Sequence, residues 1–171
     1  MTTVETKTLV EAKTLLDMAS RNHRVIQRQI DGLTHEDSLL QLPFRGNCLN
    51  WVLGHITQSR DKMLQLIDEP SIWTREQIAR YERESPPVAS GEDALSLEQI
   101  VSDFNTAHER LINKLQQMTL DDLAAPAKPV IQNTPPWSVG ELLHFLLWHE
   151  TYHVGQTEIL RQLAGKNDKV I

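Results

Sequence analysis

The sequence has too little cysteine for an intramolecular disulfide framework, since Cys48 is the single cysteine among 171 residues. A lone thiol fits a reducing compartment better than a disulfide-stabilised secreted protein. The first residues also lack the uninterrupted apolar stretch of a signal peptide, because charged side chains are scattered through them. We therefore expect a cytoplasmic protein.

Long hydrophobic runs and clusters of basic residues are also missing. No segment approaches the ~20 apolar residues that a membrane-spanning helix needs. Lys and Arg number 17 against 23 Asp and Glu, which gives a formal net charge of -6. No stretch gathers Lys and Arg as a phosphate-tracking surface would require. We expect neither a membrane nor a nucleic acid to be a partner.

Aromatic residues are scarce at 5 %, while hydrophobic residues make up 40 % of the chain and Leu, Gln and Glu are frequent. This composition is typical of a water-soluble helical protein. The length suffices for one domain with a proper core and is short for two. The sequence therefore predicts an all-α protein with a single domain over residues 1–171.

Apolar or small residues recur at spacings of three and four in four long segments, as they do on one face of a helix. The segments cover about residues 9–30, 47–67, 96–118 and 138–163. Residues 68–95 lack such a period, and a connection of this length can run along a bundle and start the third helix from the opposite end. We predict a four-helix bundle whose second and third helices are parallel and joined by this long crossover.

The expected helix boundaries coincide with residues that favour them. Asn47 is a good N-cap for the second helix, and Gly32 ends the first. Ser96-Leu-Glu-Gln99 and Ser138-Val-Gly-Glu141 have the spacing of capping boxes, in which the serine and the fourth residue satisfy each other's backbone N–H groups. We expect these two segments to begin the third and fourth helices.

The last helix carries two histidines, His149 and His153, on an inward seam with Leu142, Phe145 and Tyr152. A helix turns about 100° per residue, so the two imidazoles lie one turn apart on the same face and can hold one metal ion. Burying them is costly unless their nitrogens find partners, and a metal satisfies one nitrogen on each. The alternative is that each is a hydrogen-bonded core histidine.

A stable transition-metal site usually needs at least three protein ligands, and His55 is the expected third. It lies in the second predicted helix, whose apolar content requires burial. His144 faces outward on the last helix and is excluded as a ligand, and His35 is expected to be exposed in a short turn. His23 and His108 lie in apolar seams. Each either packs in the core, lines a substrate pocket or supports the metal ligands.

The pentapeptide from 149 to 153 also matches the HExxH motif of zinc peptidases. The metzincin extension of that motif needs Gly at position 156 and His at 159, where this chain has Gln156 and Ile159. Thermolysin-like enzymes take their third metal ligand from a glutamate well downstream of the motif. Here the carboxylates after His153 are Glu158, only five residues on, and Asp168 in the tail. The chain also shows no strand to bind an extended peptide. A metallopeptidase is therefore the least expected function.

With Trp51-Val-Leu-Gly-His55-Ile on one helix and His149-Glu-Thr-Tyr-His153-Val-Gly-Gln156 on another, the sequence resembles the DinB/YfiT-like superfamily of metal-dependent proteins. The resemblance covers nearly the whole chain through helix order, the long middle connection and the capped final helix. All three ligand positions match, although Val154 stands where one common form of the family has a basic residue.

The resemblance implies a four-helix bundle with an up-down-down-up course and a crossover between its second and third helices. It also implies a divalent ion such as zinc or nickel at a three-His site, and frequent homodimers. Characterised relatives of this kind include enzymes that use low-molecular-weight thiols, as transferases or as a thiol-dependent isomerase.

Three neutral imidazoles leave the charge of a bound ion uncompensated and one or more coordination positions open, which lowers the pKa of a bound water or thiol. We therefore expect a metal-dependent transferase or hydrolase in which this site activates a low-molecular-weight thiol cosubstrate or water for reaction with a small-molecule substrate. Tyr152 and Gln156 are expected near enough to orient the activated group.

Two further residues, Glu150 and Cys48, lie near the expected site. Glu150 either makes a hydrogen bond in support of the metal ligands or is a solvated surface carboxylate. Cys48 shares a face with His55 but lies ~10 Å along the helix axis, too far to ligate the same ion. The alternative from a different class is a non-catalytic helical bundle with a structural or sensory metal, for which Trp148 near the outward stripe would suit a dimer interface.

Overall fold

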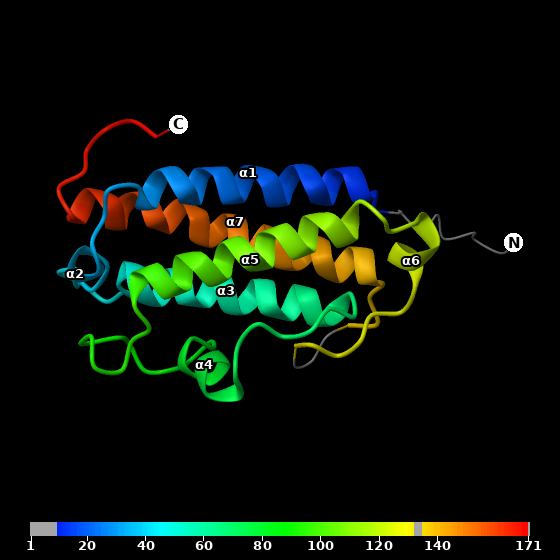
Figure 1. Cartoon of the computed structure of the whole chain (residues 1–171), viewed down its shortest axis with the longest axis horizontal. Helices are drawn as coiled ribbons and strands as arrows, with labels where there is room; N and C mark the ends of the chain where they lie inside the picture. The colour runs from blue at the N-terminus through cyan, green and yellow to red at the C-terminus, as the bar shows by residue number, and fades with distance from the viewer. Residues whose placement is uncertain (1–9, 132–134, 171) are drawn as a thin grey trace, which may run out of the picture.

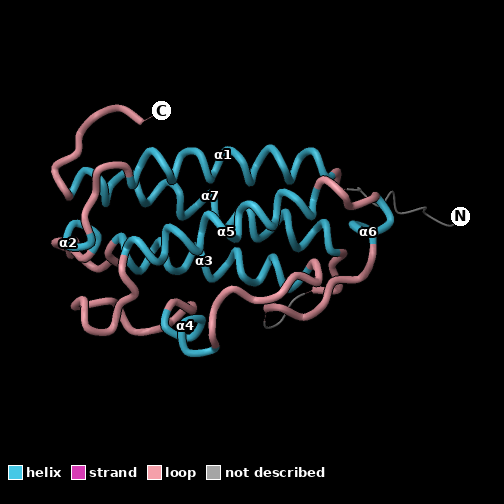
Figure 2. The backbone as a smooth tube through the Cα atoms, in the orientation of Figure 1, coloured by secondary structure: helices cyan, strands magenta, loops and turns pink. Residues whose placement is uncertain are grey.

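The computed structural model describes residues 10–131 and 135–170. Within these ranges the secondary structure is helical and no strand is formed (Figures 1 and 2). The helices are α1 (Ala12–Ile30), α2 (His35–Ser38), α3 (Leu49–Leu66), α4 (Arg75–Arg80), α5 (Leu97–Leu115), α6 (Leu120–Ala124) and α7 (Val139–Leu163). The predicted all-α class is confirmed for this part of the chain.

The four long helices lie side by side along the longest axis of the molecule (Figure 1). Each packs against two others, in the cyclic order α1, α7, α3, α5. In Figure 1 the helices α1 and α7 run in one direction, and α3 and α5 run in the other. The crossover that contains α4 passes along the outside of α3 and returns the chain to the end of the bundle where α5 begins.

The buried apolar side chains form two clusters, one toward each end of the bundle. The first includes Ile26, Ile56, Ile100, Phe104 and Leu160, and the second includes Leu15, Met63, Leu111, Leu143 and Leu147. In α1, α3 and α7 a polar residue stands between the two sets, namely Asn22, Arg60 and Glu150, and in α5 His108 follows Ala107, the first residue of the second set in that helix. A polar layer therefore crosses the middle of the apolar core.

The N-terminus of α7 forms as expected. The Ser138 hydroxyl accepts the Glu141 backbone N–H, and the Glu141 carboxylate accepts the Ser138 backbone N–H. At α5 the Ser96 hydroxyl accepts the backbone N–H of Gln99, but the Gln99 amide donates to Asp103 at 2.8 Å. The capping box predicted there is therefore only half formed.

The expected cap of α3 is wrong by one residue. Cys48 occupies the N-cap position in place of Asn47, and its side chain makes no capping hydrogen bond. The thiol is 1 % exposed and lies 3.6 Å from the carbonyl oxygen of Val88. Cys48 is thus a packed residue.

Among the described residues, no helix is both long enough and apolar enough to cross a membrane.

Candidate metal centre

Three histidines from two helices meet between α3 and α7. His55 of α3 and His149 and His153 of α7 each offer a ring nitrogen, and these atoms lie within 4.8 Å of one another. The Nε2 atoms of His149 and His153 are 3.1 Å apart. The His55 ring stands edge-on to both, with centroid separations of 5.2 Å to His149 and 4.8 Å to His153. The bundle thus brings together all three expected ligands.

Hydrogen bonds fix two of these imidazoles with Nε2 as the free nitrogen. The Nδ1–H of His55 donates to the carbonyl oxygen of Tyr81 at 2.7 Å, and the Nδ1–H of His153 donates to Oε1 of Gln156 at 2.6 Å. A neutral imidazole carries one N–H, so donation from Nδ1 leaves a lone pair on Nε2 for a metal. Gln156, expected to orient the cosubstrate, contacts a ligand histidine instead and fixes its ring.

Burial keeps the three imidazoles in their metal-binding form. It lowers the pKa of His55 to about 4 and that of His149 to about 4, and it also lowers the pKa of His153. Positive charge on one imidazole would further disfavour protonation of its neighbours. All three are therefore neutral at pH 7, so a metal need not displace protons there.

The crossover supports His55 through Tyr81, which sequence reasoning missed. The Tyr81 side chain is 0 % exposed, its ring packs against Gly54, and its hydroxyl donates to Oδ1 of Asn50 at 2.9 Å. The same hydroxyl accepts the backbone N–H of Leu95 at 2.8 Å. Gly54 was the available signal, because a glycine inside a helical pattern can mark a close approach. These contacts hold the Tyr81 carbonyl against His55.

Glu150 is not a surface carboxylate, so that interpretation is wrong. It is 0 % exposed and forms an ion pair with Arg60 of α3, whose Nε and Nη2 donate to the two carboxylate oxygens. The carboxylate is therefore committed to Arg60 and not to a ligand imidazole. An HExxH peptidase uses this glutamate as its general base, and here it is not available for that role.

His23 and His108 belong to the polar layer around the same ion pair. Arg60 donates from Nη1 to Nδ1 of His108 at 3.2 Å, and the rings of His108 and His23 stack with centroids 3.8 Å apart. Nε2 of His23 lies 2.9 Å from Oδ1 of Asn105. Burial, followed by the charge of Arg60, lowers the pKa of His108 to about 3. Both histidines are thus packed, half-buried and neutral.

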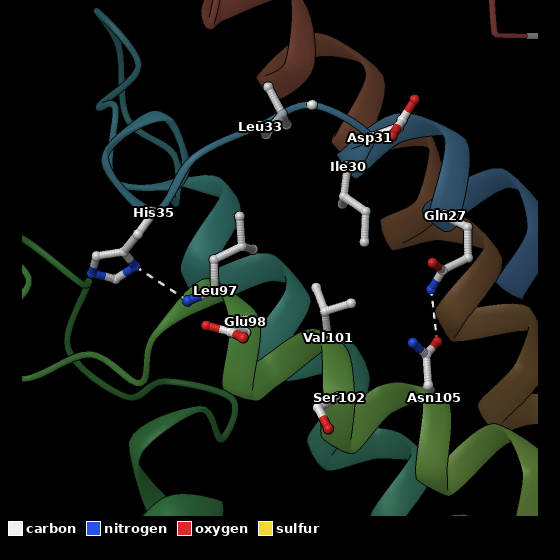
Figure 3. A pocket seen from close by; sticks show the side chains of 11 residues that line it. Gln27, Ile30, Asp31, Leu33, His35, Leu97, Glu98, Val101, Ser102 and Asn105 are labelled. Atoms are coloured by element: carbon white, nitrogen blue, oxygen red, sulfur yellow. Dashed lines mark hydrogen bonds between the residues drawn. The ribbon is translucent and has the colours of Figure 1, made fainter.

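The remaining histidines lie away from the three-His cluster. His144 is exposed, as expected. His35 was expected to be exposed, but it is half-buried because its Nδ1 accepts the backbone N–H of Leu97 at the start of α5, at 3.2 Å. It lies at one end of a groove of about 570 Å³ between α1 and α5, where Gln27 and Asn105 join the two walls (Figure 3).

The expected inward seam of α7 is partly wrong. Tyr152 is 62 % exposed, Phe145 is half-buried, and the fully buried side includes Leu143 and Leu147. The Tyr152 ring nevertheless stands edge-on to His153, with centroids 5.1 Å apart. Tyr152 therefore lies at the surface beside the three-His cluster.

Comparisons with known proteins agree with this fold. The sequence profile of the DinB superfamily matches residues 18–157, a span that includes all three histidines. A conserved protein from Enterococcus faecalis has a similar structure, with a TM-score of 0.66, 14 % identity, and coverage of 92 % of this chain and 98 % of that one. A DinB-like protein from Bacillus cereus gives a TM-score of 0.59 and 21 % identity, with coverage of 90 % and 92 %. No curated protein matches the chain.

Proposed function

Because this chain belongs to the DinB superfamily, we propose that it is a divalent-metal-dependent enzyme of the thiol S-transferase type. The observation that carries the proposal is the convergence of His55, His149 and His153, two of them held with Nε2 free. Imidazole nitrogens suit zinc and nickel, and we propose one of these as the ion. A low-molecular-weight thiol is the proposed cosubstrate, with water as the alternative that would make the protein a hydrolase.

The chain's own residues would bind the ion and leave room for a substrate. His55, His149 and His153 supply three neutral donors, fewer than the four of a closed structural site. A divalent ion held there supplies a Lewis acid that lowers the pKa of a thiol or water toward neutrality. Trp51 stacks on His55 with centroids 4.8 Å apart and keeps water from that side of the ring. Tyr152 is exposed beside His153, where it can contact a small-molecule substrate.

Metal content tests the site directly. Wild type purified without an affinity tag should carry about one divalent ion per chain, and His55→Ala and His153→Ala should lose it while staying helical. His144→Ala is the matched control, because this exposed histidine lies on the same helix and should not affect the metal. Mass spectrometry of the metal and circular dichroism give the two readouts. Full metal occupancy in His55→Ala would contradict a metal site shared between α3 and α7.

The class of reaction needs a separate assay. Metal-loaded wild type is incubated with an electrophilic substrate and each of several thiols, and thiol adducts are measured by mass spectrometry. Adduct formation that depends on the metal supports a transferase, whereas hydrolysis without adduct supports activation of water. A metal-loaded protein that does neither would favour the rival, a non-catalytic bundle whose metal is structural or sensory.

We also propose a homodimer formed through α7. Trp148, Tyr152 and Ile159 follow one another on the outer side of this helix and are 56 %, 62 % and 55 % exposed. Large apolar side chains exposed along one helix face can mark an interaction site, and a second copy of the same face would cover them in a symmetric pair. The dimer would put two three-His sites near one interface, since His153 neighbours Tyr152.

Trp148→Glu is expected to convert such a dimer to a monomer, because it places two like charges at the centre of an apolar interface. Leu120→Glu is the matched control, since Leu120 is 52 % exposed but belongs to α6 and not to α7. Light scattering after size exclusion measures the mass of each. Equal masses for wild type and Trp148→Glu would contradict an α7 interface.

The proposed enzyme has an up-down-down-up bundle as its framework, supported by the helix directions in Figure 1. We further propose a cytoplasmic location, where low-molecular-weight thiols are reduced and the free thiol of Cys48 is stable.

A further inference from the structure

Lys62 stands on the same face of α3 as His55. The two residues are seven positions apart, which is about two helical turns, so their side chains leave the helix in nearly the same direction. Lys62 Nζ lies 3.3 Å from Oε1 of Glu82 in the crossover, and the two side chains are 21 % and 50 % exposed. The ammonium group is therefore held at the edge of the protein with access to solvent.

The crossover segment 81–85 contacts both His55 and Lys62. Tyr81 accepts a hydrogen bond from His55 through its carbonyl oxygen, and the next residue, Glu82, pairs with Lys62. Ser85 Oγ accepts the Nε1–H of Trp51 at 2.9 Å. One short segment thus contacts α3 at three levels around His55. Lys62 is therefore held by the same segment that orients His55 and is not a free surface lysine.

The charges around the cluster favour an anion. A divalent ion held by His55, His149 and His153 would bring two positive charges to the cluster. Each nearby negative group is paired with a cation: Glu82 with Lys62, Glu84 with Arg83, and the buried Glu150 with Arg60. Because the three metal-binding side chains are neutral, they add no negative charge of their own.

We propose that Lys62 recognises a carboxylate on the thiol cosubstrate that meets the three-His site. This inference rests on the proposed function and narrows the cosubstrate to anionic thiols. Glu82 occupies Lys62 when the cosubstrate is absent, and the incoming carboxylate takes its place. An ammonium–carboxylate hydrogen bond at a partly buried site is stronger than one between neutral groups, so it selects against thiols that lack the carboxylate.

Two thiols of similar size test the inference. Protein loaded with cobalt(II) is titrated with 3-mercaptopropionate and with 2-mercaptoethanol, and the sulfur-to-cobalt absorption gives both affinities without any turnover. Wild type should bind 3-mercaptopropionate about tenfold more tightly than 2-mercaptoethanol. Lys62→Gln should lose this preference while its affinity for 2-mercaptoethanol stays unchanged. Comparing the ratio between variants cancels the intrinsic difference between the two thiols.

Two control variants sharpen the test. Glu82→Gln removes the competing carboxylate and should raise the preference for 3-mercaptopropionate. Lys128→Gln removes a lysine that is far from Lys62 in sequence and pairs with Asp68. This variant should leave the preference unchanged. An affinity ratio in Lys62→Gln equal to the ratio in wild type would overturn the inference.

Failure of the thiol chemistry itself gives a different result. If neither thiol changes the spectrum of the cobalt(II) protein, the proposed use of thiols fails. Acetate then decides the role of Lys62 separately, because its carboxylate needs no thiol. Tighter acetate binding by wild type than by Lys62→Gln would keep an anion-recognising lysine, and equal binding would reject it.

Discussion

Arg60→Met is expected to lower the free energy of unfolding by about 3–5 kcal/mol, because it leaves the carboxylate of Glu150 buried without its partner. Both side chains are 0 % exposed. Arg60 also donates to the carbonyl oxygen of Ala19 and to Nδ1 of His108, each at 3.2 Å. One substitution therefore removes polar contacts to the other three long helices. Urea unfolding at neutral pH, followed by circular dichroism, measures the change.

Arg110→Met is the matched control for this experiment. Arg110 pairs with Glu69 at 3.0 Å, but the two side chains are 27 % and 29 % exposed, so the expected loss is below about 1 kcal/mol. The double variant Arg60→Met/Glu150→Leu replaces the buried pair with apolar groups and should recover most of the lost stability. A loss in Arg60→Met as small as that in Arg110→Met would show that the buried pair contributes no more than an exposed one.

The helices and the ligand histidines could be predicted because their signals are local. The period of three and four residues marks an amphipathic helix within one segment, and the Ser138 box depends on residues three apart. His149 and His153 need only one turn of one helix to be recognised as a pair. His55 was the harder assignment, since its approach to them depends on how α3 packs against α7.

The Arg60–Glu150 pair could not be predicted, because neither residue type signals burial and nothing in either helix points to the partner 90 positions away. Taken singly, an arginine or a glutamate in a helix is most often at the surface. Only the packing of α3 against α7 shows that each of these two neutralises the other inside the core. The error over Glu150 therefore reflects information that is absent from its own helix.

The buried side of α7 was misjudged for a different reason. Its first half is apolar almost all round, with Leu142, Leu143, Leu146 and Leu147 fully or nearly fully buried. A helix that contacts both α1 and α3 buries more than one stripe, so apolar spacing alone does not set its rotation. Tyr152 was assigned to the core on that spacing and is instead 62 % exposed.

Gly54→Ala is expected to weaken metal binding although it removes no ligand. A Cβ at this position would lie 2.1 Å from Cδ1 and 2.4 Å from Cε1 of Tyr81. The Tyr81 ring is fully buried and its hydroxyl is held by Asn50, so it cannot swing aside. The crossover must shift instead, and it carries the carbonyl oxygen that orients His55. Loss of such a supporting contact typically costs about 10–100-fold in metal affinity.

Two opposing effects decide the stability of this variant. Alanine is favoured over glycine inside a helix by about 1 kcal/mol, whereas overpacking a filled core costs about 1–3 kcal/mol and sometimes more. The separation of 2.1 Å is far inside contact distance and involves a ring held in place, so we expect overpacking to dominate. Net destabilisation should therefore accompany the loss of affinity. Competition with a chromophoric chelator measures the affinity, and urea unfolding of the metal-free protein measures the stability.

Gly155→Ala separates this mechanism from any general effect of alanine near the site. Gly155 lies between His153 and Gln156 and is therefore also close to the site. Unlike at Gly54, a Cβ at this position meets no atom within 4 Å. The helix preference then acts alone, so the variant should gain about 0.5–1 kcal/mol and keep its metal affinity. If Gly54→Ala also kept wild-type affinity, the Tyr81 carbonyl would not be what orients His55, and its Nε2 would be directed by the packing of α3 against α7 alone.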